Sequence, residues 1–400
     1  MSNTHSTLPN FRSVDFLESH IKSIIEFYNH AKDESGGFFH NYLDNGEVYD
    51  RGTKHLVSSC RMIFNFEQSH RLFGDENHKL MAQHGLAFLR SQHWQNSRQG
   101  YVWTFENYQV NDETNQCYGL AFVMLAFATV LKQGDESARA DIYHTWSLLE
   151  KHFWQAEQGL YADEVSADWS QTSDYRGQNA NMHMCEALIF AYEATHDDQF
   201  LDRAYALSRT IAVEQADKSG GLIWEHFKFD LNIDWDYNKD DPKNLYRPWG
   251  FQPGHQTEWT KLLLMLHKHK PENWMVERAQ QLFDKAFEIA WDTEHGGLFY
   301  GFDPDGNICD EDKYFWVQAE SFAAAALLAQ ATGDEKYWKH YDQLWQYSWR
   351  HFIDHKHGAW FRILNADNSK VTDKKSEAGA KCDYHTLGAC TLVVDSLKAK

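Results

Sequence analysis

Three histidines lie near the start of apolar segments that have the length and pattern of helices: His183, His255 and His385. An imidazole, whose ordinary pKa is about 6.5, takes up and releases protons at neutral pH. One histidine among the 23 of this chain is by itself more often structural than catalytic. Three of them at equivalent heights in helices that face a common axis would instead bracket one small molecule. The pattern therefore predicts acid–base chemistry at these residues.

Three charged residues also occur inside apolar segments: Arg61, Glu258 and Glu320. A charged side chain is buried only when a partner or a ligand compensates for its lost hydration. One interpretation is a set of internal ion pairs that brace the fold, and the other is a polar cavity that binds hydroxyl groups. The two are compatible, because an ion pair that lines a cavity can also bind a ligand.

A repeated unit positions these residues. Six times a glycine is followed at once by apolar and aromatic residues, and these glycines recur about every 60 residues. They are Gly37, Gly100, Gly159, Gly221, Gly297 and Gly358. Between successive copies lie a strongly apolar helical pattern and then an amphipathic one with a charged face. The sequence therefore predicts two alternating kinds of helix, inner and outer.

The apolar patterns predict inner helices at residues 56–73, 114–131, 181–194, 256–266, 315–331 and 386–397. Amphipathic patterns such as 14–31, 203–213 and 336–352 predict outer helices. An open stack of repeats needs polar ends, but 386–397 is as apolar as the middle segments, so the two ends are expected to meet. The predicted fold is all-α, an (α/α)6 barrel of six inner and six outer helices that forms one catalytic domain over residues 1–400.

The composition limits the classes of partner. A formal net charge of −20 argues against binding to nucleic acids or anionic membranes, which requires basic patches. Residues 1–12 are polar and lack the apolar core of a signal peptide, and no apolar stretch approaches a membrane span. The six cysteines show no CxxC spacing and are expected to be reduced. We expect a cytoplasmic protein with a small neutral ligand; the sequence does not indicate its oligomeric state.

The fourth unit is the longest, and its extra residues fall in the segment 226–254. This segment places Trp235, Tyr237, Tyr246 and Trp249 among Asp and Asn residues, together with Arg247. Aromatic rings and hydrogen-bonding groups can cover a sugar, so we expect a lid over a site formed by the long polar loops. The alternative is an insertion without a function.

Four motifs at the starts of the predicted inner helices resemble one known family. They are Arg61 after Lys54-His55-Leu56, Asn179-x-Asn181-x-His183, Gly254-His255-x-x-Glu258-Trp259, and Asp383-Tyr384-His385. In this order they resemble the N-acylglucosamine 2-epimerase superfamily, over about residues 14–397. The resemblance implies an (α/α)6 barrel that acts on an opened sugar without a metal or another cofactor. The chain length and Cys60-Arg61-Met62 resemble the branch of aldose–ketose isomerases that act on mannose or sulfoquinovose.

For that branch the resemblance implies interconversion of free mannose and fructose through a cis-enediolate. A proton on C2 beside an aldehyde is weakly acidic, so its removal needs a positioned base and a group that stabilises charge on O1. We assign proton transfer between C2 and C1 to His385, and ring opening to His255. The residues assigned to substrate binding are Arg61, Asn179, His183, Arg247, Glu258, Trp316 and Glu320.

Other functions stay open at this point. A sugar 2-epimerase would use two bases on opposite faces of the sugar, and the sequence does not show which face each histidine addresses. An inverting glycoside hydrolase needs two separated carboxylates, for which Glu258, Glu320 and Asp112 are available. A sugar-binding protein would show no turnover. His351, His355 and His357 could suggest a metal site, but we expect a solvated tip of an outer helix away from the loop face.

Overall fold

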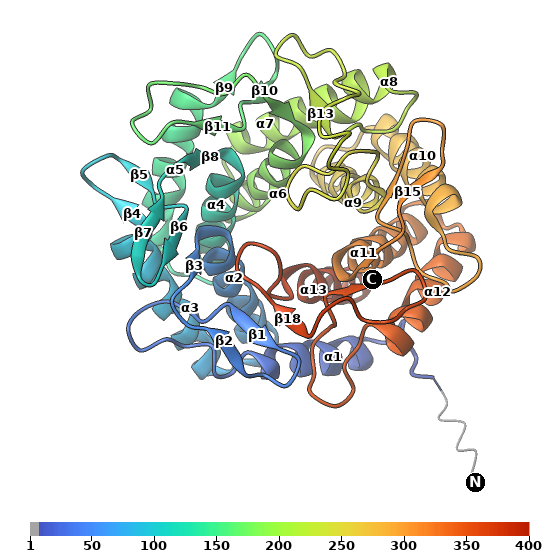
Figure 1. Ribbon diagram of the computed structural model, residues 1–400, viewed down its shortest axis with the longest axis horizontal. Helices are drawn as coiled ribbons and strands as arrows, with labels where there is room; N and C mark the ends of the chain where they lie inside the picture. The colour runs from blue at the N-terminus through green and yellow to red at the C-terminus, as the bar shows by residue number, and fades with distance from the viewer. Residues whose placement is uncertain (1–7, 400) are drawn as a thin grey trace.

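The computed structural model describes residues 8–399, which form a closed double ring of helices (Figure 1). The first seven residues of the polar N-terminal segment lie outside the described part. The inner ring consists of α2 (Leu56–Phe73), α4 (Cys117–Lys132), α6 (Gln178–Thr195), α9 (Pro253–His269), α11 (Phe315–Thr332) and α13 (Tyr384–Lys398). Each inner helix packs against the next, and α13 packs against α2. The predicted (α/α)6 barrel and the meeting of its ends are therefore confirmed.

The outer ring consists of α1 (Val14–Phe27), α3 (Glu76–Phe88), α5 (Ala138–His152), α7 (Asp198–Arg209), α10 (Asn273–Ala290) and α12 (Glu335–His351). Two outer helices change geometry near their ends. The π-helical turn η1 (Leu89–His93) follows α3, and η2 (Thr210–Gln215) and the short α8 (Ala216–Lys218) follow α7. The predicted outer helix at 203–213 is therefore part of a longer, interrupted one.

The two rings differ because their helices meet different surroundings. Inner helices are buried on almost every side, and α4 is apolar along nearly its whole length. Outer helices bury one face, and the side chains of Asp75, Asp197 and Asp334 accept hydrogen bonds from backbone N–H groups at the starts of α3, α7 and α12. Such caps satisfy N–H groups that have no partner within the helix. An Asp residue thus caps the start of the outer helix in three units.

Short strands lie in the loops at the end of the barrel where the inner helices begin. They are β1 (Asn41–Leu43), β2 (Val48–Asp50), β3 (Lys54–His55), β4 (Trp94–Gln95), β5 (Gly100–Tyr101), β6 (Thr104–Glu106), β7 (Gln109–Asp112), β8 (Asn115–Gln116), β9 (Trp154–Gln155), β10 (Leu160–Tyr161), β11 (Glu164–Val165), β12 (Arg176–Gly177), β13 (His226–Phe227), β14 (Gly301–Phe302), β15 (Ile308–Asp310), β16 (Lys313–Tyr314), β17 (Ile363–Leu364) and β18 (Lys374–Ser376).

The pairing of these strands follows the repeat. The segment before one inner helix pairs antiparallel with the segment that follows the next Gly-aromatic signal: β3 with β6, β8 with β11, β12 with β13, and β16 with β17. Between the fourth and fifth units, a bridge of Phe251 and Phe302 takes this place. The pair β18–β1 joins the last unit to the first. Backbone pairing thus fixes the start of every inner helix, where the candidate residues lie.

No helix among residues 8–399 is long and apolar enough to cross a membrane. The six cysteines are free thiols, and Cys60, Cys117, Cys185, Cys382 and Cys390 are buried.

Candidate active site

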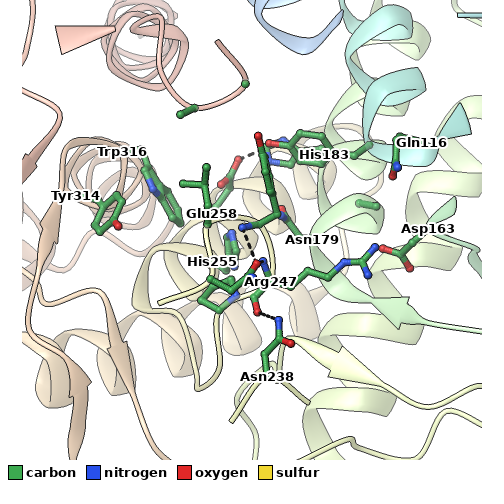
Figure 2. A pocket seen from close by; sticks show the side chains of 18 of the residues that line it. Gln116, Asp163, Asn179, His183, Asn238, Arg247, His255, Glu258, Tyr314 and Trp316 are labelled. Atoms are coloured by element: carbon green, nitrogen blue, oxygen red, sulfur yellow. Dashed lines mark hydrogen bonds and ion pairs between the residues drawn. The ribbon is translucent and has the colours of Figure 1, made fainter. Parts of the chain in front are cut away.

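A cavity of about 460 Å³ opens at the end of the barrel where the inner helices begin. Its size is in the range of small-molecule sites. All six inner helices contribute to its wall, for example Arg61 (α2), Tyr118 (α4), His183 (α6), His255 (α9), Trp316 (α11) and His385 (α13). Figure 2 shows His183, His255, Glu258 and Asn179 converging on this space. The structure thus brings together every predicted site residue except Glu320, which lies behind His385 and not on the wall.

The height of a residue in the cavity depends on its position in the inner helix. The sixth residues of α2, α6, α9 and α11 are Arg61, His183, Glu258 and Glu320, and they form the deep layer. His255 is the third residue of α9, and His385 the second of α13. The predicted equal height of the three histidines is therefore wrong for His183. It lies about one turn deeper, because three or four residues make one helical turn.

His385 is held between a carboxylate and a cation. Its Nδ1 lies 2.7 Å from Oε1 of Glu320, and its Nε2 lies 3.4 Å from Nη2 of Arg61. A carboxylate on Nδ1 favours the tautomer that carries its proton there, so Nε2 presents a lone pair to the cavity. Burial lowers the pKa of His385 below its ordinary value, and Glu320 opposes only part of that shift. The neutral, basic form therefore predominates at neutral pH.

Aromatic side chains surround the guanidinium of Arg61. Its guanidinium is 4.4 Å from the ring centre of Phe122 and 5.2 Å from that of Tyr384, and Nη2 donates a hydrogen bond of 2.9 Å to the hydroxyl of Tyr118. Its side chain forms no ion pair among the described residues. A buried guanidinium without a carboxylate partner is available to an anionic oxygen of a ligand.

His255 has a carboxylate partner of its own. Its Nδ1 lies 2.9 Å from both carboxylate oxygens of Glu225, and Gln178 Nε2 donates to the same carboxylate at 2.9 Å. Gln178 is in turn held by the indole N–H of Trp259, at 2.8 Å. The histidine thus has a fixed ring orientation, and its Nε2 has no hydrogen-bond partner among residues 8–399. Two His–Glu pairs therefore open onto one cavity.

Trp316 separates the two histidines. Its ring centre lies 5.0 Å from that of His255 and 5.7 Å from that of His385. The ring occupies the space next to Gly254, where an added Cβ would come within 2.4 Å of it. The glycine in Gly254-His255 is therefore required by close packing of Trp316, which presents an apolar surface to the cavity.

The predicted lid, residues 226–254, has one part that packs on the barrel and another that lines the cavity. Trp235 and Trp249 pack on Trp224 and do not line the cavity, so their expected role in covering a ligand is wrong. Tyr237 and Tyr246 do line it. Arg247 also lies on the wall, ion-paired with Glu164 and bonded to the Tyr237 hydroxyl at 3.0 Å, and Figure 2 shows it extending toward Asp163.

Asn181, although part of the motif, has a structural contact set. Its amide oxygen accepts from the backbone N–H of Tyr161, and its amide nitrogen donates to the carbonyls of Tyr161 and Gly177. Asn179, two residues earlier, lines the cavity, and its Oδ1 is buried without a hydrogen-bond partner. Only the second asparagine position therefore serves the fold, and Asn179 is free to bind a hydroxyl.

The carboxylates do not have the arrangement of an inverting glycosidase. An oxygen of Glu258 and one of Glu320 lie within 4.8 Å of each other, whereas inverting enzymes separate their carboxyl groups by about 6.5–9.5 Å. Asp112, the third candidate, accepts a hydrogen bond from its own loop and does not line the cavity. The three predicted carboxyl groups therefore do not supply the acid–base pair of this alternative.

Two groups of side chains have the donor atoms of a metal site: His183, Glu186 and Glu258, and Glu258, Glu320 and His385. The ammonium of Lys261 lies 3.1, 3.6 and 2.8 Å from oxygens of Glu186, Glu258 and Glu320. It thus occupies the position that a cation would take. His351 is the last residue of the outer helix α12, and His355 and His357 follow it, at the same end of the barrel as the cavity. Their predicted place away from the loop face is therefore wrong, and they form no such group in residues 8–399.

The prediction from sequence did not include Glu225, Asp163 or Arg362. Asp163 and Arg362 line the cavity, and Glu225 holds His255. Each stands four positions after a lead glycine of the repeat, namely Gly159, Gly358 and Gly221. The fourth position after each lead glycine was therefore the feature of the sequence by which these residues could have been predicted.

Comparison with known proteins agrees with this architecture. The sequence profile of N-acylglucosamine 2-epimerase (GlcNAc 2-epimerase) matches residues 37–389. The chain is 54% identical to a D-mannose isomerase of Marinomonas mediterranea over 391 residues, 97% of this chain and 99% of that one. A crystal structure of a D-mannose isomerase superposes with a TM-score of 0.96, at 54% identity, over 98% of this chain and 100% of that one. A cellobiose 2-epimerase from Bacillus thermoamylovorans shares the fold at a TM-score of 0.86 and 20% identity, over 96% and 99% of the two chains. The chain belongs to the N-acylglucosamine 2-epimerase family.

Proposed function

We propose that this protein is an aldose–ketose isomerase that interconverts free D-mannose and D-fructose through a cis-enediolate. The observation that carries the proposal is the placement of a neutral base, His385 Nε2, 3.4 Å from the guanidinium of Arg61. One side chain can take a proton from carbon while the other stabilises the charge that develops on the adjacent oxygen. The 54% identity to a D-mannose isomerase over nearly the whole chain supports the choice of sugar.

The first step is ring opening, which we assign to His255. Its Nε2 accepts the proton of the O1 hydroxyl while the bond between C1 and O5 breaks, and that proton then passes to O5. Glu225 stabilises the imidazolium formed in between, because its carboxylate accepts a hydrogen bond from Nδ1. The product of this step is the open-chain aldehyde.

The second step moves hydrogen between C2 and C1. Nε2 of His385 takes the C2 proton, the electron pair forms the double bond between C1 and C2, and negative charge collects on O1 next to Arg61. His385 then returns the proton to C1 on the same face, while a proton passes from O2 to O1, which gives fructose. Glu320 stabilises the charged form of His385 through Nδ1 and acts as a positioning residue.

The remaining wall residues hold the sugar. Burial and the neighbouring Glu320 raise the pKa of Glu258 well above its ordinary value, so this side chain is a neutral acid that can donate to a hydroxyl. Asn179 and Arg247 offer an acceptor and donors, and Trp316 a flat apolar face. His183 stays neutral, because burial lowers its pKa to about 3, and it can bind a hydroxyl in the deep layer.

The proposal has three further parts. The double ring acts as one catalytic domain, the reaction needs no metal or other cofactor, and its ligand is a monosaccharide. We place the enzyme in the cytoplasm, in agreement with its free thiols.

A sugar 2-epimerase is the second candidate, and the observation that favours it is the second His–Glu pair at the same cavity. In that reaction the two histidines would act on opposite faces of C2. The product formed at the initial rate from mannose separates the two functions. We expect fructose first, with part of the label from [2-²H]mannose at C1. Glucose that carries solvent hydrogen at C2, formed at the initial rate without fructose as its precursor, would overturn the isomerase assignment.

A further inference from the structure

A buried ammonium group lies beneath the cavity and does not touch it. Lys261, on α9 one turn after Glu258, is only 5% exposed, and it is absent from the cavity wall. Its Nζ lies 2.8 Å from Oε2 of Glu320, 3.1 Å from Oε1 of Glu186 and 3.6 Å from Oε1 of Glu258. Three inner helices thus direct carboxyl groups at one lysine.

The charges around this lysine balance only if one carboxyl group is protonated. Two cations face the cluster, Lys261 from α9 and Arg61 from α2, against the three carboxyl groups of Glu186, Glu258 and Glu320. The other titratable groups around the cluster are Tyr118 on α4, His183 on α6, and Tyr384 and His385 on α13, together with Cys382 beside Arg61. A third buried carboxylate would lack a counter-charge, which is costly in a desolvated site.

Hydrogen bonds decide which carboxyl group keeps the proton. Glu186 accepts from the Tyr384 hydroxyl at 2.7 Å, and Glu320 from Nδ1 of His385 at 2.7 Å, so both are stabilised as carboxylates. Neither oxygen of Glu258 has a hydrogen-bond partner. Although burial alone would raise the pKa of Glu320, Lys261 and His385 hold it below its ordinary value. The proton therefore belongs to Glu258, the only one of the three that lines the cavity.

We propose that Lys261 is a positioning residue that sets the distribution of protons in the active site. It keeps Glu320 ionised, so that His385 carries its proton on Nδ1 and presents a basic Nε2, and it leaves Glu258 as the neutral acid. The proposal rests on the role of His385 as the base in the proposed function. It adds a residue that touches neither the sugar nor the reacting atoms.

Removal of the ammonium has a defined consequence. In Lys261→Met the cluster retains one cation, Arg61, so a further proton must enter at neutral pH. Glu186 keeps the hydrogen bond from Tyr384, whereas Glu320 loses its nearest counter-charge. The proton therefore enters the Glu320–His385 pair. A proton on Glu320 moves the imidazole hydrogen to Nε2, and a proton on the imidazole gives imidazolium, so either outcome removes the base.

The decisive measurement is the ¹⁵N chemical shift of the two His385 ring nitrogens in the free enzyme. In the wild type we expect Nε2 to give the chemical shift of an unprotonated ring nitrogen. In Lys261→Met at pH 7 we expect Nε2 to be protonated, so that this signal is lost. Turnover should fall by about 10²–10³-fold, and the acid limb of the pH–rate profile should move upward by about one unit or more. Lys261→Arg should retain the tautomer. Lys270→Met, at the exposed end of the same helix, is the matched control and should change neither measurement.

A double variant separates charge balance from packing. Lys261→Met combined with Glu186→Gln removes one cation and one carboxylate, so Arg61 again balances Glu320. We expect the His385 tautomer and the acid limb to return toward the wild type, even if the protein is less stable. An unprotonated Nε2 in Lys261→Met at pH 7, or a double variant with no recovery of the tautomer, would overturn the proposal. The tautomer is observed without substrate, so a wrong isomerase assignment, detected through the sugar product, is a separate outcome.

Discussion

Replacement of Glu225 by glutamine tests whether His255 opens the sugar ring while His385 removes the C2 proton. The carboxylate lies 2.9 Å from His255 Nδ1 through both oxygens, and the pair is buried. Glutamine has the same shape but no charge, so it stabilises the imidazolium less. A hydrogen bond to a charged group contributes about 1.5–3 kcal/mol. Because about 1.4 kcal/mol is tenfold in rate, we expect kcat/KM for mannose to fall by about 10-fold to about 150-fold.

The kinetic isotope effect shows which step has slowed. Initial rates are compared for mannose with ¹H and with ²H at C2, the hydrogen that the proposed base removes. If His255 opens the ring, Glu225→Gln makes ring opening limiting, and the isotope effect on kcat/KM should fall toward one. Glu320→Gln slows removal of the C2 hydrogen by His385 instead, so its isotope effect should equal or exceed that of the wild type.

A third His–Glu pair, which lies outside the cavity, provides the control. His269 Nε2 lies 2.9 Å from Oε1 of Glu193, and neither residue lines the cavity. Glu193→Gln removes the same kind of interaction and should leave both the rate and the isotope effect unchanged. An isotope effect that rises in Glu225→Gln and falls in Glu320→Gln would exchange the two roles and refute the reasoning.

Two further predictions concern protons and metals. Burial raises the pKa of Asp163 to about 7, so the folded state holds a proton that the unfolded chain releases above about pH 4. The wild type should therefore lose free energy of unfolding relative to Asp163→Asn by about 1.4 kcal/mol per unit as pH rises from about 4 to 7, measured by urea unfolding, and parallel curves would contradict this. Exhaustive dialysis against a chelator should leave turnover unchanged, because Lys261 already neutralises the buried carboxylates; loss of activity that is restored by one added divalent ion would contradict it.

The repeat made the fold predictable from the sequence. Each unit carries the same glycine and the same alternation of apolar and amphipathic helices, and the predicted bounds of the first inner helix, 56–73, agree with α2. The apolar last helix indicated closure, because its face would otherwise meet water. The sequence did not indicate the π-helical end of α7, where a local change of hydrogen bonding leaves the apolar pattern intact.

Site residues were predictable from the sequence where they stand out within the pattern of one helix. They were less predictable where two residues distant in the sequence meet only in the folded structure. Arg61, Glu258 and Glu320 were conspicuous as charges in apolar helices. Lys261 belongs to the same class, because it stands in the middle of the predicted inner helix 256–266, but the prediction did not include it. The partner of His255, Glu225, stands 30 positions away in a strand-like segment. Such pairs depend on the register of β12–β13 and its neighbours, which sequence periodicity does not specify.

Catalytic function in this ring depends on differences among equivalent positions. The sixth residues of the inner helices from α2 to α11 are Arg61, Phe122, His183, Glu258 and Glu320. They place a cation, an aromatic ring, a neutral imidazole and two carboxyl groups at one height around one axis. In a symmetric ring, these positions would carry identical charges, and the charges would repel each other strongly because no water would screen them. Two carboxyl groups in this layer are tolerated because Arg61 and the deeper Lys261 oppose them, and because Glu258 stays protonated. The asymmetry that stabilises the buried layer therefore also places a neutral carboxyl group and a cation at the cavity, as the proposed function requires.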